Sequence, residues 1–179
     1  MPERQAAGLP ARSTGRRHLR TVTVAAAGLL LLFAGAWGPP LIVWNASPSS
    51  PRGLYALMPG TPRVGDTVLV REDAALARMA ARRGYLPRGR PLVKTLAARS
   101  GDRACAAGDD LRINGRLVAA RRKADGAGRP LPRWSGCRRL VAGEVLLLGL
   151  GDPKSFDGRY HGPSAASDVL GPARLLWGV

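Results

Sequence analysis

The hydrophobic positions near the start of the chain form one uninterrupted block. Residues 21–44 carry no charge, whereas residues 1–20 carry five arginines and a single acid. An apolar run of this length predicts one membrane-spanning helix, which should end near Gly38 because Pro39 and Pro40 follow. Its length of ~27 Å would just cross the hydrocarbon core of a bilayer. We therefore expect a basic cytoplasmic N-terminus at 1–20 and a transmembrane anchor or signal segment at 21–44.

The same block also fits a cleaved signal peptide. Its apolar part, 21–33, is followed by the small residues Ala34-Gly35-Ala36, which is the pattern of a cleavage site. In both cases the basic start keeps the N-terminus in the cytoplasm, and the chain beyond residue 44 is exported. The sequence alone leaves retention and cleavage open.

Downstream of this block, short apolar runs alternate with turn signals. A helix is predicted from about Asp73 to Arg83, with Gly84 and Pro87 behind it as stop signals. The pattern predicts strands within residues 63–71, 91–102, 143–151 and 169–177.

Turn chemistry completes the exported part. In LRINGRLV, residues 111–118, the pair Asn114-Gly115 predicts a hairpin with a type I′ turn. The segment DPKSFDGRYHGP, residues 152–163, is polar and rich in turn residues, so we expect it outside the core. About six short strands and one helix make residues 45–179 a mainly β domain.

The charge is strongly basic but has no recognisable focus. The net charge is +16, and 25 of the 28 basic residues are arginines scattered along the chain. No nucleic-acid-binding motif accompanies them, so compositional bias and attraction to an anionic membrane explain the charge better than a nucleic-acid partner. Lysine is scarce, with only Lys94, Lys123 and Lys154.

Cys105 and Cys137 are the only cysteines, and both lie in the exported part. An even pair in an oxidising compartment predicts a disulfide, worth roughly 3 to 4 kcal/mol for a loop of about 32 residues. Metal binding is not expected, because two thiols and His161 lack the close spacing of a zinc site. We expect no cofactor.

Two residues could act as the base for a serine nucleophile. His161 is the only histidine in the exported part, and nothing marks it beyond its place in a polar turn. A lysine would need its pKa lowered by about 3 units, roughly 4 kcal/mol, which burial in apolar surroundings can supply. Lys94 alternates with Leu92 and Leu96 along one strand face and suits this role, although a strand lysine can also extend its ammonium to water.

The exported region contains, in this order, the motifs NASPSSPRGLY, KTLAARSGD and GDPKSFDGRYHGP, which extend over nearly its whole length. Together they resemble the conserved motifs of the type I signal peptidase superfamily, in particular its conjugal-transfer branch, the TraF-type peptidases. The resemblance implies that Ser49 is the nucleophile and Lys94 the general base, and that the Ser47 hydroxyl helps to bind the oxyanion. It also implies that Ser155 and Asp157 orient the lysine and support the site.

The resemblance further implies a coiled β-sheet peptidase domain with one short helix, preceded by a single N-terminal transmembrane helix. The expected substrate is a pilin-like precursor of a conjugation apparatus. The expected location is a bacterial inner membrane with the catalytic domain in the periplasm, where other conjugation or type IV secretion components are possible partners. A general signal peptidase and an inactive, anchored assembly factor are the alternatives. Hydrolysis and cyclisation of the product both stay open.

Overall fold

The computed structural model describes residues 42–179, so the predictions for residues 1–41 lie outside it. Within the described residues, no helix has the length and apolar character needed to cross a bilayer. The first strand, β1, begins at Ile42, so the last three residues of the expected 21–44 segment belong to the folded domain.

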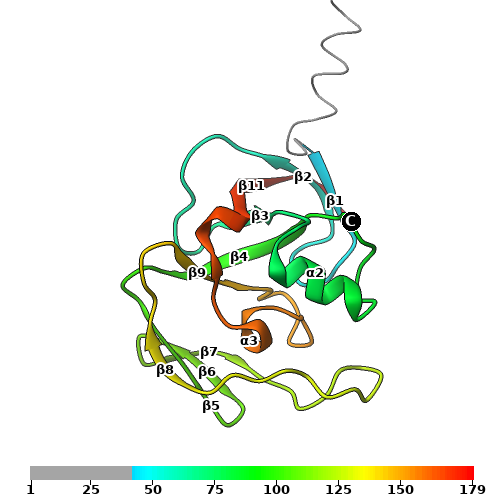
Figure 1. The fold of residues 1–179 in the computed structure, drawn as a ribbon. Coiled ribbons are helices and arrows are strands. Elements are labelled where there is room, and N and C mark those ends of the chain that lie inside the picture. Colours follow the sequence, from blue (N-terminus) through cyan, green and yellow to red (C-terminus); the bar gives the residue numbers. More distant parts are fainter. Residues whose placement is uncertain (1–41) are drawn as a thin grey trace, which may run out of the picture. The chain divides into compact units, whose positions relative to one another are not determined.

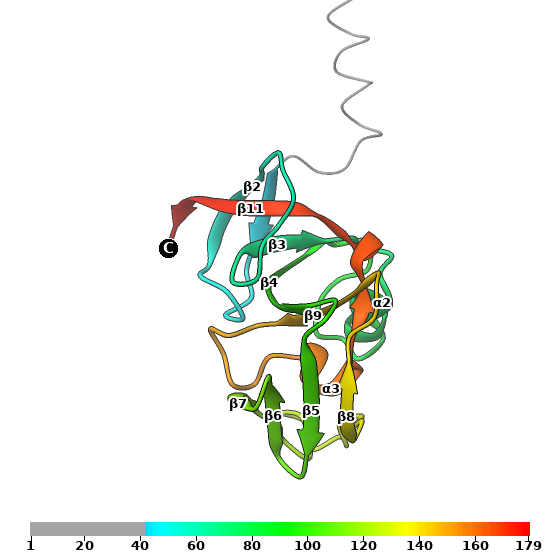
Figure 2. The same cartoon turned by 90° about the vertical axis from the view of Figure 1, so that its left-hand side faces the viewer.

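Two antiparallel sheets make up most of the domain (Figure 1). The larger sheet has seven strands in the order β1-β2-β11-β3-β4-β9-β10. Its strands are β1 (Ile42–Asn45), β2 (Gly53–Leu57), β3 (Thr67–Val70), β4 (Leu92–Arg99), β9 (Glu144–Leu148), β10 (Ser164–Ala165) and β11 (Val169–Gly178). The smaller sheet has the order β7-β6-β5-β8, formed by β5 (Arg103–Ala107), β6 (Asp110–Ile113), β7 (Arg116–Ala120) and β8 (Gly136–Arg139). It lies at the end of the domain away from β1, β2 and β11 in both views (Figures 1 and 2).

Strand β11 joins the two halves of the larger sheet. Its first residues pair with β3 and its last with β2, with an irregularity at each section. Pro172 cannot donate to a ladder, but its carbonyl accepts a hydrogen bond from Met58 N–H at 2.8 Å. Bulges bend a strand and increase its twist, so the larger sheet curls instead of lying flat.

Within residues 42–179, three helical segments accompany the sheets: α2 (Ala75–Arg82), α3 (Gly158–His161) and the 3₁₀ turn η1 (Ala166–Asp168). Helix α2 buries Leu76, Ala77 and Ala80 against Val68 and Leu147 of the larger sheet. A second core lies where Leu146 and Leu148 of β9 and apolar residues of the smaller sheet meet. Strand β9 therefore contributes to both cores, which explains its continuous apolar sequence.

Several sequence predictions are confirmed, and two need correction. Strands β3, β4, β9 and β11, helix α2 and the Asn114-Gly115 hairpin lie where the pattern predicts them. Asn114 and Gly115 have φ of 50° and 83°, as a type I′ turn requires. The estimate of about six strands and one helix was too low, because eleven strands and two α-helices lie within residues 42–179.

The second correction concerns the polar segment 152–163. It was expected outside the core, yet residues 155–160 are all buried. The reason is that its charged and polar groups satisfy one another, as the site geometry shows.

Candidate active site

The loop between β1 and β2 carries the candidate nucleophile and is held by a buried asparagine. The Asn45 side-chain amide donates hydrogen bonds to the carbonyls of Ser47, Ser50 and Pro51 at 2.9, 3.2 and 3.1 Å. Its Oδ1 accepts from Ser47 N–H at 3.1 Å. The Tyr55 hydroxyl donates to the Pro51 carbonyl at 2.9 Å. Sequence reasoning missed Asn45, although an asparagine that starts a turn was the available signal.

Ser47 and Ser49 lie side by side in this loop. The Ser47 hydroxyl donates to Ser49 Oγ at 3.0 Å and accepts from Ser49 N–H at 3.3 Å. Ser49 is buried, with 4% of its surface exposed. The Ser47 hydroxyl and the Ser49 N–H are donors of the kinds that can bind an oxyanion, and in this structure each donates within the loop.

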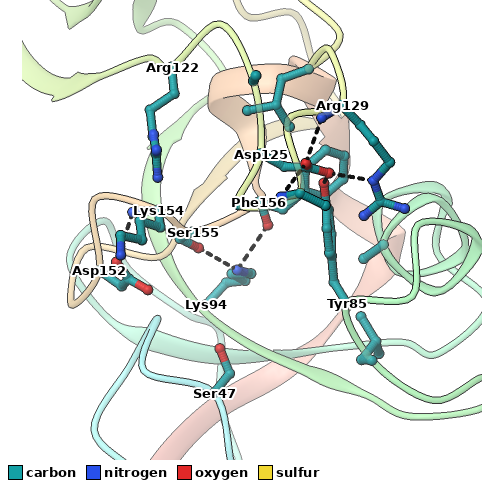
Figure 3. Close-up of a pocket in the computed structure, with 16 residues that line it drawn as sticks. Ser47, Tyr85, Lys94, Arg122, Asp125, Arg129, Asp152, Lys154, Ser155 and Phe156 are labelled. Atoms are coloured by element: carbon teal, nitrogen blue, oxygen red, sulfur yellow. Dashed lines mark hydrogen bonds and ion pairs between the residues drawn. The ribbon is translucent and has the colours of Figure 1, made fainter.

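Lys94 lies in β4 between β3 and β9 and is almost fully buried, with 4% of its surface exposed. Its Nζ donates to Ser155 Oγ at 2.9 Å and to the Phe156 carbonyl at 3.1 Å (Figure 3). Burial lowers the pKa of Lys94 to about 8, and the positive charge of Arg159 acts in the same direction, while Asp157 and Asp152 oppose it. A lysine with this pKa has an appreciable neutral fraction near neutral pH and can accept a proton.

Gly149 brings the serine loop and the lysine together. A Cβ at this position would lie 2.1 Å from Ser155 Oγ and 2.6 Å from Ser49 Cβ, so only glycine lets these two side chains approach. Two residues later, Gly151 N–H donates to the Ser49 carbonyl at 3.1 Å. In this state Ser49 Oγ bonds to Ser47, and Lys94 Nζ bonds to Ser155 and Phe156.

Asp157 is hydrogen-bonded to Gly149 and forms a buried ion pair with Arg159. The Asp157 carboxylate accepts from Gly149 N–H at 2.7 Å and from Arg159 Nη2 at 2.8 Å. The Arg159 guanidinium also donates to the carbonyls of Gly149, Asp152 and Pro153. Both side chains are buried, and their mutual satisfaction explains why this polar segment can enter the core.

Lys94 thus donates its hydrogen bonds to Ser155 and the Phe156 carbonyl and not to Asp157. Sequence reasoning also missed Arg159, whose signal was an arginine two residues from an acid, between the aromatic residues Phe156 and Tyr160. His161, the alternative base, lies in α3 and lines neither of the two cavities described below.

Two cavities open beside Ser47. The first has a volume of about 430 Å³, and its walls include Ser47, Lys94, Ser155 and Phe156. The second, of about 780 Å³, runs along β1 and the segment 85–91. Both are lined by Ser47, Tyr85 and Leu86, so both border the serine loop. Among residues 42–179 no cluster of three metal-ligating side chains occurs.

The two cysteines of the predicted disulfide line neither cavity. Cys105 and Cys137 face each other in the β5–β8 ladder and are joined by a disulfide.

Comparison with known proteins places these features in a family. The model of the signal peptidase family, peptidase S26, matches residues 16–178. A plasmid transfer protein TraF from Escherichia coli is 36% identical over 164 residues, which are 86% of this chain and 92% of that protein. A probable conjugal transfer protein TraF from Sinorhizobium fredii is 33% identical over 167 residues, with 87% of this chain and 85% of that protein covered.

Among solved structures, a signal peptidase I from Enterococcus faecalis matches with a TM-score of 0.38 and 19% identity, and the match covers 64% of this chain and 98% of that one. The family assignment rests on the sequence matches, which extend over most of the chain. The chain belongs to the signal peptidase family, peptidase S26, and is similar to the TraF-type proteins of plasmid transfer.

Proposed function

We propose that this chain is a membrane-anchored serine endopeptidase that processes exported precursor proteins with a Ser49/Lys94 dyad. The observation that carries the proposal is a buried lysine with a lowered pKa that lines, together with Ser47 of the serine loop, a cavity of about 430 Å³. Membership of the signal peptidase family supports it. The names of the relatives refer to plasmid and conjugal transfer, which is the ground for proposing a pilin-like precursor as substrate. The basic start and the uncharged run of residues 21–44 are the ground for proposing an inner-membrane anchor with the domain in the periplasm.

In the proposed mechanism, the Ser49 hydroxyl turns from Ser47 towards Lys94. Neutral Lys94 takes the proton, and Ser49 Oγ attacks the scissile carbonyl carbon. The negative oxygen that forms is stabilised by Ser49 N–H and the Ser47 hydroxyl. The Lys94 ammonium then protonates the leaving amine as the C–N bond breaks, and Lys94 activates the water that hydrolyses the acyl-enzyme. Ser155 and the Phe156 carbonyl hold Nζ in place throughout.

The first test is processing of candidate pilin precursors co-expressed with the full chain. Ser49→Ala and Lys94→Ala should each abolish cleavage, because each removes a group that no neighbour replaces. Lys123→Ala is the matched control, since Lys123 is exposed and lines neither cavity. Mass spectrometry of the product locates the cleaved bond and shows whether the new ends are free or joined in a ring. Cleavage by Lys94→Ala at the wild-type rate would exclude the dyad.

The second test is the pH dependence of kcat/KM. Only neutral Lys94 can accept the proton, and it becomes neutral as pH rises through its pKa of about 8. The rate should therefore increase about tenfold per pH unit below this pKa and level off above it. A rate that does not change between about pH 6 and pH 9 would contradict Lys94 as the base.

A further inference from the structure

We propose that Arg122 and Lys154 select substrates that carry an acidic residue near the scissile bond. This inference rests on the proposed peptidase function and adds the class of substrate. The two side chains, named here the basic pair, line the same cavity as Ser47 and Lys94. Figure 3 shows them on one side of Lys94, with Tyr85 and Asp125 on the other.

The acids of the cavity wall do not pair with these two cations. The Asp125 carboxylate accepts hydrogen bonds from Tyr85 Oη at 2.6 Å and from Arg129 Nε at 2.8 Å, so its charge is already paired with Arg129. Asp152 Oδ1 accepts from the backbone N–H of Lys154 at 2.8 Å. Within residues 42–179, neither the Arg122 guanidinium nor the Lys154 ammonium makes an ion pair or a hydrogen bond. This side of the cavity therefore carries one acidic side chain, Asp152, and two cationic ones, so it has an excess of positive charge.

Both cations are attached to fixed backbone positions. Arg122 N–H donates to the Tyr160 hydroxyl at 3.0 Å. The preceding residue, Arg121, is buried and its guanidinium donates to the carbonyls of Trp134 and Gly108, both at 2.6 Å. Lys154 is held through its backbone bond to Asp152. The peptide ligand thus meets two positive groups whose chain positions are set before it binds, which lowers the entropy cost of pairing.

A role in tuning the lysine does not account for the basic pair. The cation that lowers the pKa of Lys94 is Arg159, and the acids that raise it are Asp157 and Asp152. Arg122 and Lys154 line the cavity and are exposed, so a substrate carboxylate can approach them from solvent. A carboxylate bound there gains charge-assisted hydrogen bonds and offsets the excess positive charge.

The test uses the full chain in detergent and internally quenched peptides that share one cleavage site flanked by small residues. Each peptide carries Asp, Asn or Lys at one position, and the set covers every position from four residues before to four residues after the scissile bond. At one or more positions the wild type should cleave the Asp peptide with a kcat/KM about tenfold above that of the Asn peptide, and the Lys peptide should be the poorest. The preference should shrink at about 0.5 M NaCl, because both cations are exposed.

Arg122→Gln and Lys154→Gln should each reduce the Asp:Asn ratio several-fold, and the double Arg122→Glu/Lys154→Glu variant should favour Lys. Lys123→Gln is the matched control: it removes one positive charge next to Arg122, from a residue outside the cavity wall, and should leave the ratio unchanged. Equal cleavage of Asp and Asn peptides at every position overturns the inference. So does an equal loss of the ratio in Lys123→Gln and Arg122→Gln, because bulk charge would then explain it.

Failure of the peptidase proposal gives a different result. In that case wild type and Ser49→Ala leave every peptide intact. Selection is then read from binding of the same Asp and Asn peptides to the Ser49→Ala chain by fluorescence anisotropy. Tighter binding of the Asp peptide that is lost in Arg122→Gln supports the basic pair, and equal binding overturns it.

Discussion

Two regions of this domain treat their polar groups in opposite ways. The lysine region, defined as Lys94 with residues 149–159, buries a lysine, an aspartate and an arginine. The disulfide sheet, defined as β5 to β8, directs its charged side chains to solvent, as in the Arg112–Asp110 pair, where both side chains are nearly half exposed. Buried charges are costly unless they are paired and hydrogen-bonded, whereas exposed pairs contribute little.

The difference indicates what each region does. In the lysine region the buried groups hold Lys94 and Gly149 in place by hydrogen bonds, and burying their charges lowers the stability of the domain. The disulfide sheet is stabilised by turn chemistry and a covalent bond. None of its strand residues lines either cavity, although residues of the loop after β7 line the first one. Substitutions in the two regions should therefore differ in how much they lower the free energy of unfolding and in how they affect activity.

The largest effect is expected for Asp157→Ala. It leaves the buried Arg159 guanidinium without a counter-charge and removes the acceptor of Gly149 N–H, so the free energy of unfolding should fall by about 3–5 kcal/mol. Asp110→Ala in the disulfide sheet is the control and should cost less than about 1 kcal/mol. Urea unfolding of both variants measures the difference. Similar losses in the two variants would show that burial does not make the Asp157–Arg159 pair more important for stability than the exposed Asp110–Arg112 pair.

A smaller loss is expected when the disulfide is removed. The double variant Cys105→Ala/Cys137→Ala should lower the free energy of unfolding by about 3–4 kcal/mol, because the bridge closes a loop with a sequence separation of 32. Cleavage of precursor by the folded variant should stay at the wild-type level, since neither cysteine lines a cavity. Loss of activity in a variant that is still folded would link the disulfide sheet to the site.

The two regions also differ in how far the sequence predicts them. The Asn114-Gly115 hairpin follows from local chemistry, because two adjacent positive φ angles select these residue types. Lys94 was found because it alternates with leucines on a strand, a pattern that is also local.

The burial of residues 155–160 could not be derived in this way. Asp157 and Arg159 look like solvated turn residues until the backbone folds their groups against Gly149 and one another. Sequence order alone likewise could not place Ser49 near Ser155, because a Cβ-free position on a third segment makes that approach possible. The motifs of a known family supplied Ser49, Ser155 and Asp157 without the physical reason for them, and they did not supply Arg159.

Replacing Lys94 should cause the smallest change in the free energy of unfolding at pH 7, and the sign of this change depends on pH. Burial lowers the pKa of Lys94 in the folded protein to about 8 from 10.5, so the folded state binds fewer protons than the unfolded state between these values. The free energy of unfolding of the wild type therefore rises with pH across this window, by ~3 kcal/mol from this group. Below about pH 8 the protein bears the full cost of burying the ammonium.

Lys94→Met removes this cost but leaves Ser155 Oγ and the Phe156 carbonyl without their donor, a loss of about 1 kcal/mol each. At pH 7 the variant should be inactive and about 1 kcal/mol more stable than the wild type, and near pH 10.5 it should be the less stable of the two. Urea unfolding of both proteins at the two pH values measures the change, and titration of the other groups cancels in the comparison. A difference that is constant with pH would mean that Lys94 is solvated in the folded protein, and the lysine region would then differ from the disulfide sheet only in its Asp157–Arg159 pair.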